Sequence, residues 1–248
     1  MKTYLDCIPC FIEQALRAGR IATNNETKIK ELLDSVCSMM KDIPMNNTPP
    51  ETGNIIYRKV REITGVTDPY KKIKKTNIEE ALSIYPNLKK IVNDSDNSLL
   101  TAVRLAIAGN VIDFGPNKKF DLNESVRHIL KQDFAVLHFS EFIKQIEKAE
   151  SILFIGDNAG ESVFDKILIE EIGKPVVYVV RDVPVINDVT RENAIDSGLN
   201  EVAEIISSGT TAPGTILDLC NDDFLKRFNN AEIVISKGQG NYEGLSNV

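Results

Sequence analysis

Short β-branched runs alternate with helical segments in the second part of the chain, and this pattern constrains the fold more than any other. The runs occupy residues 151–155, 175–180, 202–206 and 231–236, and helical segments lie between them near 161–172, 188–197 and 215–228. Strands that alternate with helices form βαβ crossovers and a mostly parallel sheet. We therefore predict an α/β fold in which the carboxyl ends of the strands meet at one edge.

The first part of the chain has apolar residues at helical spacing. They predict helices over residues 10–20, 28–40, 52–63, 70–93, 96–112, 121–132 and 139–149, with a break over residues 45–52. A charge run within this part is expected to be a solvated helix face; it consists of Lys71, Lys72, Lys74 and Lys75. We expect a helical domain over residues 1–150, packed on a Rossmann-like α/β domain over residues 151–248.

Composition narrows the possible partners. The chain is 42% apolar and 26% charged, which is typical of a globular protein. Its net charge of −7 argues against a nucleic-acid partner. No apolar run approaches the roughly 20 residues that span a bilayer, and the N-terminus lacks the apolar core of a signal peptide. We expect a cytoplasmic protein without a membrane partner, and the sequence does not indicate its oligomeric state.

The spacing of the cysteines and histidines does not indicate a complete zinc site. Cys7 and Cys10 form a Cys-x-x-Cys pair at the head of a helix, which could hold a low-pKa thiolate, a disulfide or half a metal site. A packing or redox-sensitive structural role is the favoured interpretation. The two histidines, His128 and His138, lie beside no carboxylate cluster, which argues against a histidine-rich zinc site and against Ser-His-Asp chemistry.

Polar residues follow each predicted strand. In chain order these are Asp157 and Asn158, then Asp182 and Asp188, then Ser207 and Ser208, and finally Lys237. Carboxylate and amide oxygens are the ligands that hard divalent cations prefer. Asp157 and Asn158 could bind such a cation together with either Asp182 or Asp188.

The same edge suits a phosphate group. Backbone amides at Gly160 and Gly209 and the two serine hydroxyls match phosphate oxygens, and Lys237 adds a point charge. A cation and a lysine together neutralise charge in phosphoryl transfer, so the set favours hydrolysis of a phosphate ester over hydride transfer. The segment 238–244 resembles a dinucleotide loop, but its glycine spacing and its place after the last strand argue against one.

Each of these residues also has a purely structural interpretation. Asp157 and Asp188 could be helix N-caps, Asn158 a turn residue, and Lys237 a solvated surface lysine. Their convergence on one sheet edge favours a functional site.

Four segments in this order resemble the damage-control phosphatase family of metal-dependent enzymes. They are Gly109–Asp113, Gly156–Glu161, Asn187–Thr190 and Lys237–Glu243, and the Cys7–Cys10 start is similar to the prokaryotic branch. The resemblance covers nearly the whole chain. It implies a divalent metal (Mn, Ni, Co or Mg) bound by Asp157, Asn158 and Asp188, which selects Asp188 over Asp182.

The resemblance also implies a substrate pocket. Lys237 would hold the substrate phosphate, and the pocket would be lined by Asn110, Asp113, Glu161, Ser207, Ser208 and Asn241. The family is linked to hydrolysis of phosphorylated sugars and related small metabolites. Comparable members continue for a further strand after the lysine motif, so we expect a chain shortened at its C-terminus.

The predicted function is therefore a divalent-metal-dependent phosphatase that acts on small phosphorylated metabolites, with water or Asp157 as the nucleophile. Two alternatives stay open at this point. One is an S-adenosylmethionine-dependent methyltransferase, which shares the α/β layout and an acidic loop after its first strand. The other is a non-catalytic protein that binds a phosphorylated metabolite.

Overall fold

A computed structural model describes residues 1–111, 130 and 132–248, without the side chains of residues 110 and 111. The first part is helical, with α1 (Cys7–Ala22), α2 (Glu26–Met40), α3 (Pro49–Thr64), α4 (Lys71–Asn93), α5 (Ser98–Val111) and α7 (Phe139–Lys148). The second part alternates β1 (Ile152–Ile155), α8 (Ser162–Ile172), β2 (Val176–Val180), α9 (Arg191–Asp196), β3 (Glu204–Ser207), α10 (Asp222–Asn230), β4 (Val234–Ser236) and α11 (Gln239–Leu245). The helix predicted over residues 121–132 lies outside the described residues except for residues 130 and 132.

The described strands form one parallel sheet in the order β3-β2-β1-β4, which confirms the predicted α/β fold. The chain moves from β1 to β2 to β3 in one direction and then places β4 on the other side of β1. The direction of winding therefore reverses between β1 and β4. In open α/β sheets, ligands bind outside the carboxyl ends of the strands at such a switch point.

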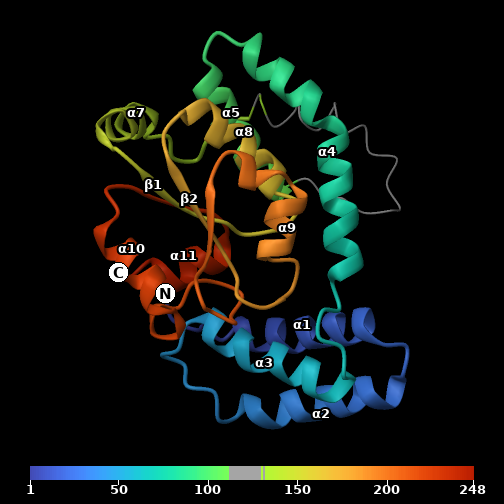
Figure 1. The fold of residues 1–248 in the computed structure, drawn as a ribbon. Helices are drawn as coiled ribbons and strands as arrows, with labels where there is room; N and C mark the ends of the chain where they lie inside the picture. Colours follow the sequence, from blue (N-terminus) through green and yellow to red (C-terminus); the bar gives the residue numbers. More distant parts are fainter. Residues whose placement is uncertain (112–129, 131) are drawn as a thin grey trace.

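Helices cover both faces of the sheet (Figure 1). On one face, Phe154 and Tyr178 belong to an apolar core shared with α4, α5, α8 and α9. On the other face, Leu153 and Ile155 pack with Phe224 of α10. Helices α4 and α5 of the first part thus share one covering layer of the sheet with α8 and α9. None of the described helices is both long enough and apolar enough to cross a membrane.

Helices α1, α2 and α3 form a layer of their own, which lies below the sheet in the view of Figure 1. The loop after β2 reaches into their core, where Val185 is buried and Ile186 packs against it. Nη1 of Arg61 in α3 donates to the carbonyl oxygen of Pro184 (3.4 Å). Ile186 has a positive φ of 45°, which a β-branched residue adopts only when its surroundings hold it there.

Several predicted boundaries were wrong for local reasons. Pro49 and Pro50 begin α3 instead of extending the break, because Thr48 and Glu51 form a capping box around them. The helix predicted over residues 215–228 is divided into a short 3-10 turn (Leu217–Leu219) and α10, whose first turn is capped by Asn221. The segment after β4, expected as a loop, forms α11.

The charge run at the start of α4 was also partly misread. Lys71, Lys72 and Lys75 are exposed, but Lys74 is only 1% exposed and its Nζ lies 2.8 Å from Oδ2 of Asp68. The prediction of a solvated face is therefore wrong for Lys74. A buried ammonium group has to be paired, because taking it out of water is costly.

We predict that Asp68→Asn lowers the free energy of unfolding by about 3 kcal/mol, because the buried Lys74 then loses the carboxylate with which it forms an ion pair. Asp94→Asn removes the partner of Lys90 on the same helix, but both of those side chains are exposed, so we expect little change. Urea unfolding of the two variants measures the difference. Equal losses in both variants would contradict the role given to burial.

Candidate active site

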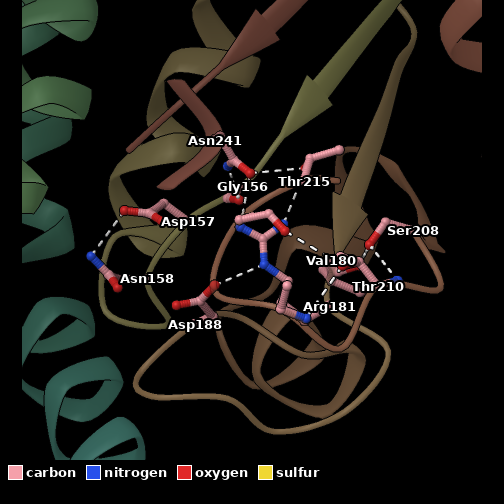
Figure 2. A network of polar contacts seen from close by, with 12 residues as sticks. Gly156, Asp157, Asn158, Val180, Arg181, Asp188, Ser208, Thr210, Thr215 and Asn241 are labelled. Atoms are coloured by element: carbon pink, nitrogen blue, oxygen red, sulfur yellow. Dashed lines mark hydrogen bonds and ion pairs between the residues drawn. The ribbon is translucent and has the colours of Figure 1, made fainter. Parts of the chain in front are cut away.

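The loops that follow β1 and β2 pair with each other at the sheet edge. The amide N–H of Val189 donates to the carbonyl oxygen of Asp157 (2.7 Å), and Asn158 and Asp188 form an isolated antiparallel bridge. This pairing brings Asp157, Asn158 and Asp188 side by side (Figure 2). The three residues predicted to bind a metal ion thus come together, although thirty residues separate Asn158 from Asp188 in the sequence.

The alternative interpretation of Asp157 and Asp188 as helix caps does not hold. The residue at the N-cap of α8 is Glu161, and the N-cap of α9 is Thr190, which forms a capping box with Asn193. Asp182 and Asp188 also differ in their surroundings. Asp182 is exposed and accepts a hydrogen bond from Oγ of Ser207 (2.8 Å), whereas Asp188 is 4% exposed and neighbours Asn158.

A buried arginine holds Asp188. Arg181 directly follows β2 and is 1% exposed, and its Nε donates to Oδ2 of Asp188 (2.7 Å). Burial raises the pKa of the Asp188 carboxyl group, and the guanidinium group of Arg181 partly offsets that rise. Arg181 therefore fixes one oxygen of Asp188 and compensates part of its charge.

Asn241 ties the ends of β1 and β4 together. Its Nδ2 donates to the carbonyl oxygens of Gly156 (3.0 Å) and Lys237 (2.7 Å), and its Oδ1 accepts from Arg181 and Thr215, both at 2.8 Å. These bonds use both donors and both lone pairs of the amide (Figure 2). Asn241 is fully buried, and its predicted contact with substrate stays a prediction.

Lys237 lies between two carboxylates of α8 and the turn before it. Its Nζ donates to Oε2 of Glu161 and to Oδ1 of Asp165, each at 2.7 Å, and its side chain is only 10% exposed. The interpretation as a solvated surface lysine is therefore wrong. Burial works to lower the pKa of the ammonium group, but Asp165 and Glu161 outweigh it and raise that pKa, so Lys237 is charged. Burial in turn raises the pKa of Asp165 to about 6.

Glu161 orients the side chain of Asn158. Nδ2 of Asn158 donates to Oε1 of Glu161 (2.5 Å) and to Oδ2 of Asp157 (3.2 Å). An amide whose nitrogen faces two carboxylates turns its oxygen away from them. The oxygen is the atom that a hard cation prefers.

The cluster carries more negative than positive charge. Among the described residues, four carboxylates (Asp157, Glu161, Asp165 and Asp188) contact or neighbour two cations, Arg181 and Lys237. Burial raises the pKa of Asp157 well above its usual value, and repulsion from Asp188 and Glu161 adds to the rise. Carboxylate and amide oxygens in such a negatively charged cluster suit a divalent cation, so the donor set fits such an ion.

Few protein side chains would be available to bind such an ion. The described part of the chain holds no group of three or more His, Cys, Asp and Glu side chains in a metal-binding arrangement. Its ligands would be the carboxylates of Asp157 and Asp188 and the amide oxygen of Asn158.

Other predicted site residues lie elsewhere or are not described. Ser207 donates to Asp182, and the buried Ser208 donates to the carbonyl oxygen of Val180 (3.1 Å). Asn110 lies in the last turn of α5, and Asp113 lies outside the described residues. All four cysteines are free thiols; Sγ of Cys10 accepts from Nε2 of Gln14 (3.1 Å), and Cys7 lies at the first position of α1.

Sequence reasoning missed three buried members of the cluster. Arg181 follows β2 directly, so its position at a strand end was the available signal. Asp165 lies four residues after Glu161, which places both carboxylates on one face of α8. Tyr178 stands in an apolar run, and nothing there distinguishes it from an ordinary core aromatic residue.

Gly238 lets the chain pass close to Asp157. A Cβ atom at this position would lie 2.1 Å from Cγ of Asp157, and the glycine has a φ of +85°. Both features require glycine directly after Lys237.

We predict that Gly238→Ala destabilises the protein by more than the about 1–3 kcal/mol expected of an unfavourable φ, because the new methyl group also displaces Asp157. Gly65→Ala is the matched control, since Gly65 has a φ of +76° but open space around its Cβ position. Urea unfolding and Mn²⁺ titration calorimetry compare the two. Similar effects of the two substitutions on Mn²⁺ affinity would contradict the close approach to Asp157.

Comparisons with known proteins match nearly the whole chain. The model of the damage-control phosphatase ARMT1-like domain matches residues 3–248. Damage-control phosphatase PH1575 of Pyrococcus horikoshii is 34% identical over all of this chain and 88% of its own length. An uncharacterized protein of Methanocaldococcus jannaschii, MJ0202, is 32% identical over 97% of this chain and 82% of its own length.

A solved structure has the same fold. The crystal structure of the DUF89 family protein PH1575 superimposes with a TM-score of 0.93 over 100% of this chain and 88% of that chain, at 32% sequence identity. Because the family model matches residues 3–248, this chain belongs to the family of damage-control phosphatase ARMT1-like domains.

Proposed function

We propose that this protein is a divalent-metal-dependent phosphatase that hydrolyses small phosphorylated metabolites such as sugar phosphates. The observation that carries the proposal is a buried cluster of four carboxylates and two cations at the switch point of the sheet. The cluster has more carboxylates than cations, and a lysine lies within it. The relative PH1575, which carries the name damage-control phosphatase, supports the same activity.

The proposed roles follow from the contacts. Asp157, Asn158 and Asp188 would hold the metal ion, which in phosphatases polarises the phosphoryl group and offsets its charge. Arg181 keeps Asp188 in place, and Glu161 keeps the amide oxygen of Asn158 directed away from the carboxylates. An ammonium group has three N–H donors, and Lys237 uses two of them within the described residues. The third would bind a phosphate oxygen and stabilise charge that develops on it.

A phosphate-release screen tests the proposal. Sugar phosphates and cofactor phosphates are offered with Mn²⁺, Ni²⁺, Co²⁺ and Mg²⁺ in turn, and calorimetry with S-adenosylmethionine serves as the comparison. Release of phosphate that requires a metal ion supports the proposal. Binding of S-adenosylmethionine without any metal-dependent release would contradict it. Acid quench during turnover separates the two nucleophiles, because only attack by Asp157 leaves a phosphorylated aspartate.

We predict that Asp188→Asn lowers kcat/KM at least about 100-fold, because it removes one of the two proposed carboxylate ligands and the carboxylate that forms an ion pair with the buried Arg181. Asp182→Asn, at the same strand end but exposed, leaves kcat/KM within a factor of about two. Steady-state kinetics on both variants decides between the two aspartates. A larger loss in the Asp182 variant would overturn the ligand assignment.

Metal binding should also be visible without turnover. At Mn²⁺ concentrations near 100 times its dissociation constant, we expect the free energy of unfolding to rise by about 2.7 kcal/mol. Asp157→Ala should abolish this rise together with phosphate release, since it removes a ligand. Thermal unfolding with Mn²⁺ and with a chelator measures the effect, and metal-dependent activity in the Asp157→Ala protein would refute the site.

A further inference from the structure

The hydroxyl group of Tyr178 ends inside the charged cluster, although none of the roles above uses it. It donates to Oδ2 of Asp165 (2.7 Å), and both residues are fully buried. The other oxygen of Asp165 accepts from Nζ of Lys237 (2.7 Å). The Asp165 carboxylate is thus held from both sides, by a phenol on β2 and by the ammonium group after β4.

The position of the phenol is itself tightly determined. Tyr178 is the register partner of Phe154, and the two rings stack with centroids 5.3 Å apart. Gly156 leaves room for the hydroxyl group, because a Cβ atom there would lie 2.4 Å from the Tyr178 oxygen. The first glycine of the loop after β1 therefore allows Tyr178 to reach α8.

We propose that Tyr178 and Asp165 are positioning residues that hold the Lys237 ammonium group so that its third N–H faces the substrate phosphate. The inference rests on the proposed function. Lysine carries its charge on a flexible four-carbon stem, so one carboxylate would leave the group free to turn about that contact. Two carboxylates fix two of its N–H directions, and tetrahedral geometry then determines the third. Asp165 can fix the Lys237 ammonium group only while the hydrogen bond from Tyr178 keeps the Asp165 carboxylate in its present orientation.

A second triad of the same chemistry provides the control. The hydroxyl of Tyr85 donates to Oε1 of Glu170 (2.6 Å), and Nζ of Lys89 lies 2.9 Å from Oε2 of Glu170. Glu170 belongs to α8, as Asp165 does, but it pairs with residues of α4 instead of a strand end. Tyr85→Phe therefore removes the same kind of hydrogen bond outside the cluster.

The experiment compares Tyr178→Phe with Tyr85→Phe. We expect Tyr178→Phe to lower kcat/KM about 10–100-fold, because residues that support an active site through hydrogen bonds have effects of this size. The dissociation constant of Mn²⁺ should change by no more than about threefold, because the hydroxyl of Tyr178 donates to Asp165, which is not a proposed metal ligand. Tyr85→Phe should leave both quantities within about twofold. Asp165→Asn keeps the side-chain shape but loses the charge, and it replaces Tyr178→Phe if that protein does not fold; the same direction of change is expected.

A readout independent of turnover follows the ammonium group itself. Lysine Nζ NMR signals are protected from exchange where the group is buried and hydrogen-bonded, and the Lys237 signal is identified by its loss in Lys237→Arg. We expect Tyr178→Phe to shift or broaden that signal and Tyr85→Phe to leave it unchanged. An unchanged signal in Tyr178→Phe would overturn the inference.

The outcomes separate this inference from the function on which it rests. Equal kcat/KM values in the two phenylalanine variants, or a parallel loss of Mn²⁺ affinity in Tyr178→Phe, overturn the inference and leave the phosphatase proposal standing. A wild-type protein that releases no phosphate with any metal overturns the proposed function. In that case the NMR signals alone decide whether Tyr178 holds the ammonium group.

Discussion

The ion pairs of Lys237 join parts of the molecule that are distant in sequence. Its ammonium group contacts Glu161 and Asp165, which are 76 and 72 residues away. A buried charge is tolerated only when it is paired, so Lys237 can leave water only after β4 has docked beside β1 and α8 has formed. The strand order and the charged cluster therefore depend on the same contact. Glu161 extends it to Asn158, which connects the lysine to the proposed metal ligands.

Arg181 has the corresponding position on the other side of the cluster. Its guanidinium group contacts Asp188 from the loop after β2 and Asn241 from α11 (Figure 2). The loop after β1 thus lies between two buried cations that come from the strands on either side of it. Such an enclosure limits how the loop can move and keeps its carboxylates close together despite their repulsion.

The sequence predicts the sheet well because its signal is local and repeated. Four β-branched runs separated by helices leave few other folds, and Asp157, Asn158 and Lys237 could be placed at strand ends by their position alone. The position of Asp188 beside Asn158 depends on the path of a loop, which includes the positive φ of Ile186 and its packing against α1–α3. Only the resemblance to a family selected Asp188 over Asp182 beforehand.

Other features depend on tertiary contacts that cannot be predicted from local sequence patterns. Lys74 stands among exposed lysines and is buried because Asp68 faces it. Tyr178 looks like any core aromatic residue until Gly156 and Asp165 are placed beside it. The order of the strands, which puts Lys237 next to Glu161, is likewise not contained in the periodicity of the sequence.

The anchoring of the loop after β2 links the site to a separate apolar core. Val185 and Ile186 are held by α1–α3, whereas Asp188, two residues further on, pairs with the loop after β1. The two cores are distinct clusters, so a local opening of the α1–α3 layer would release one end of this loop. Substitutions deep in the helical layer, far from any charged group, would set the upper temperature at which the enzyme works.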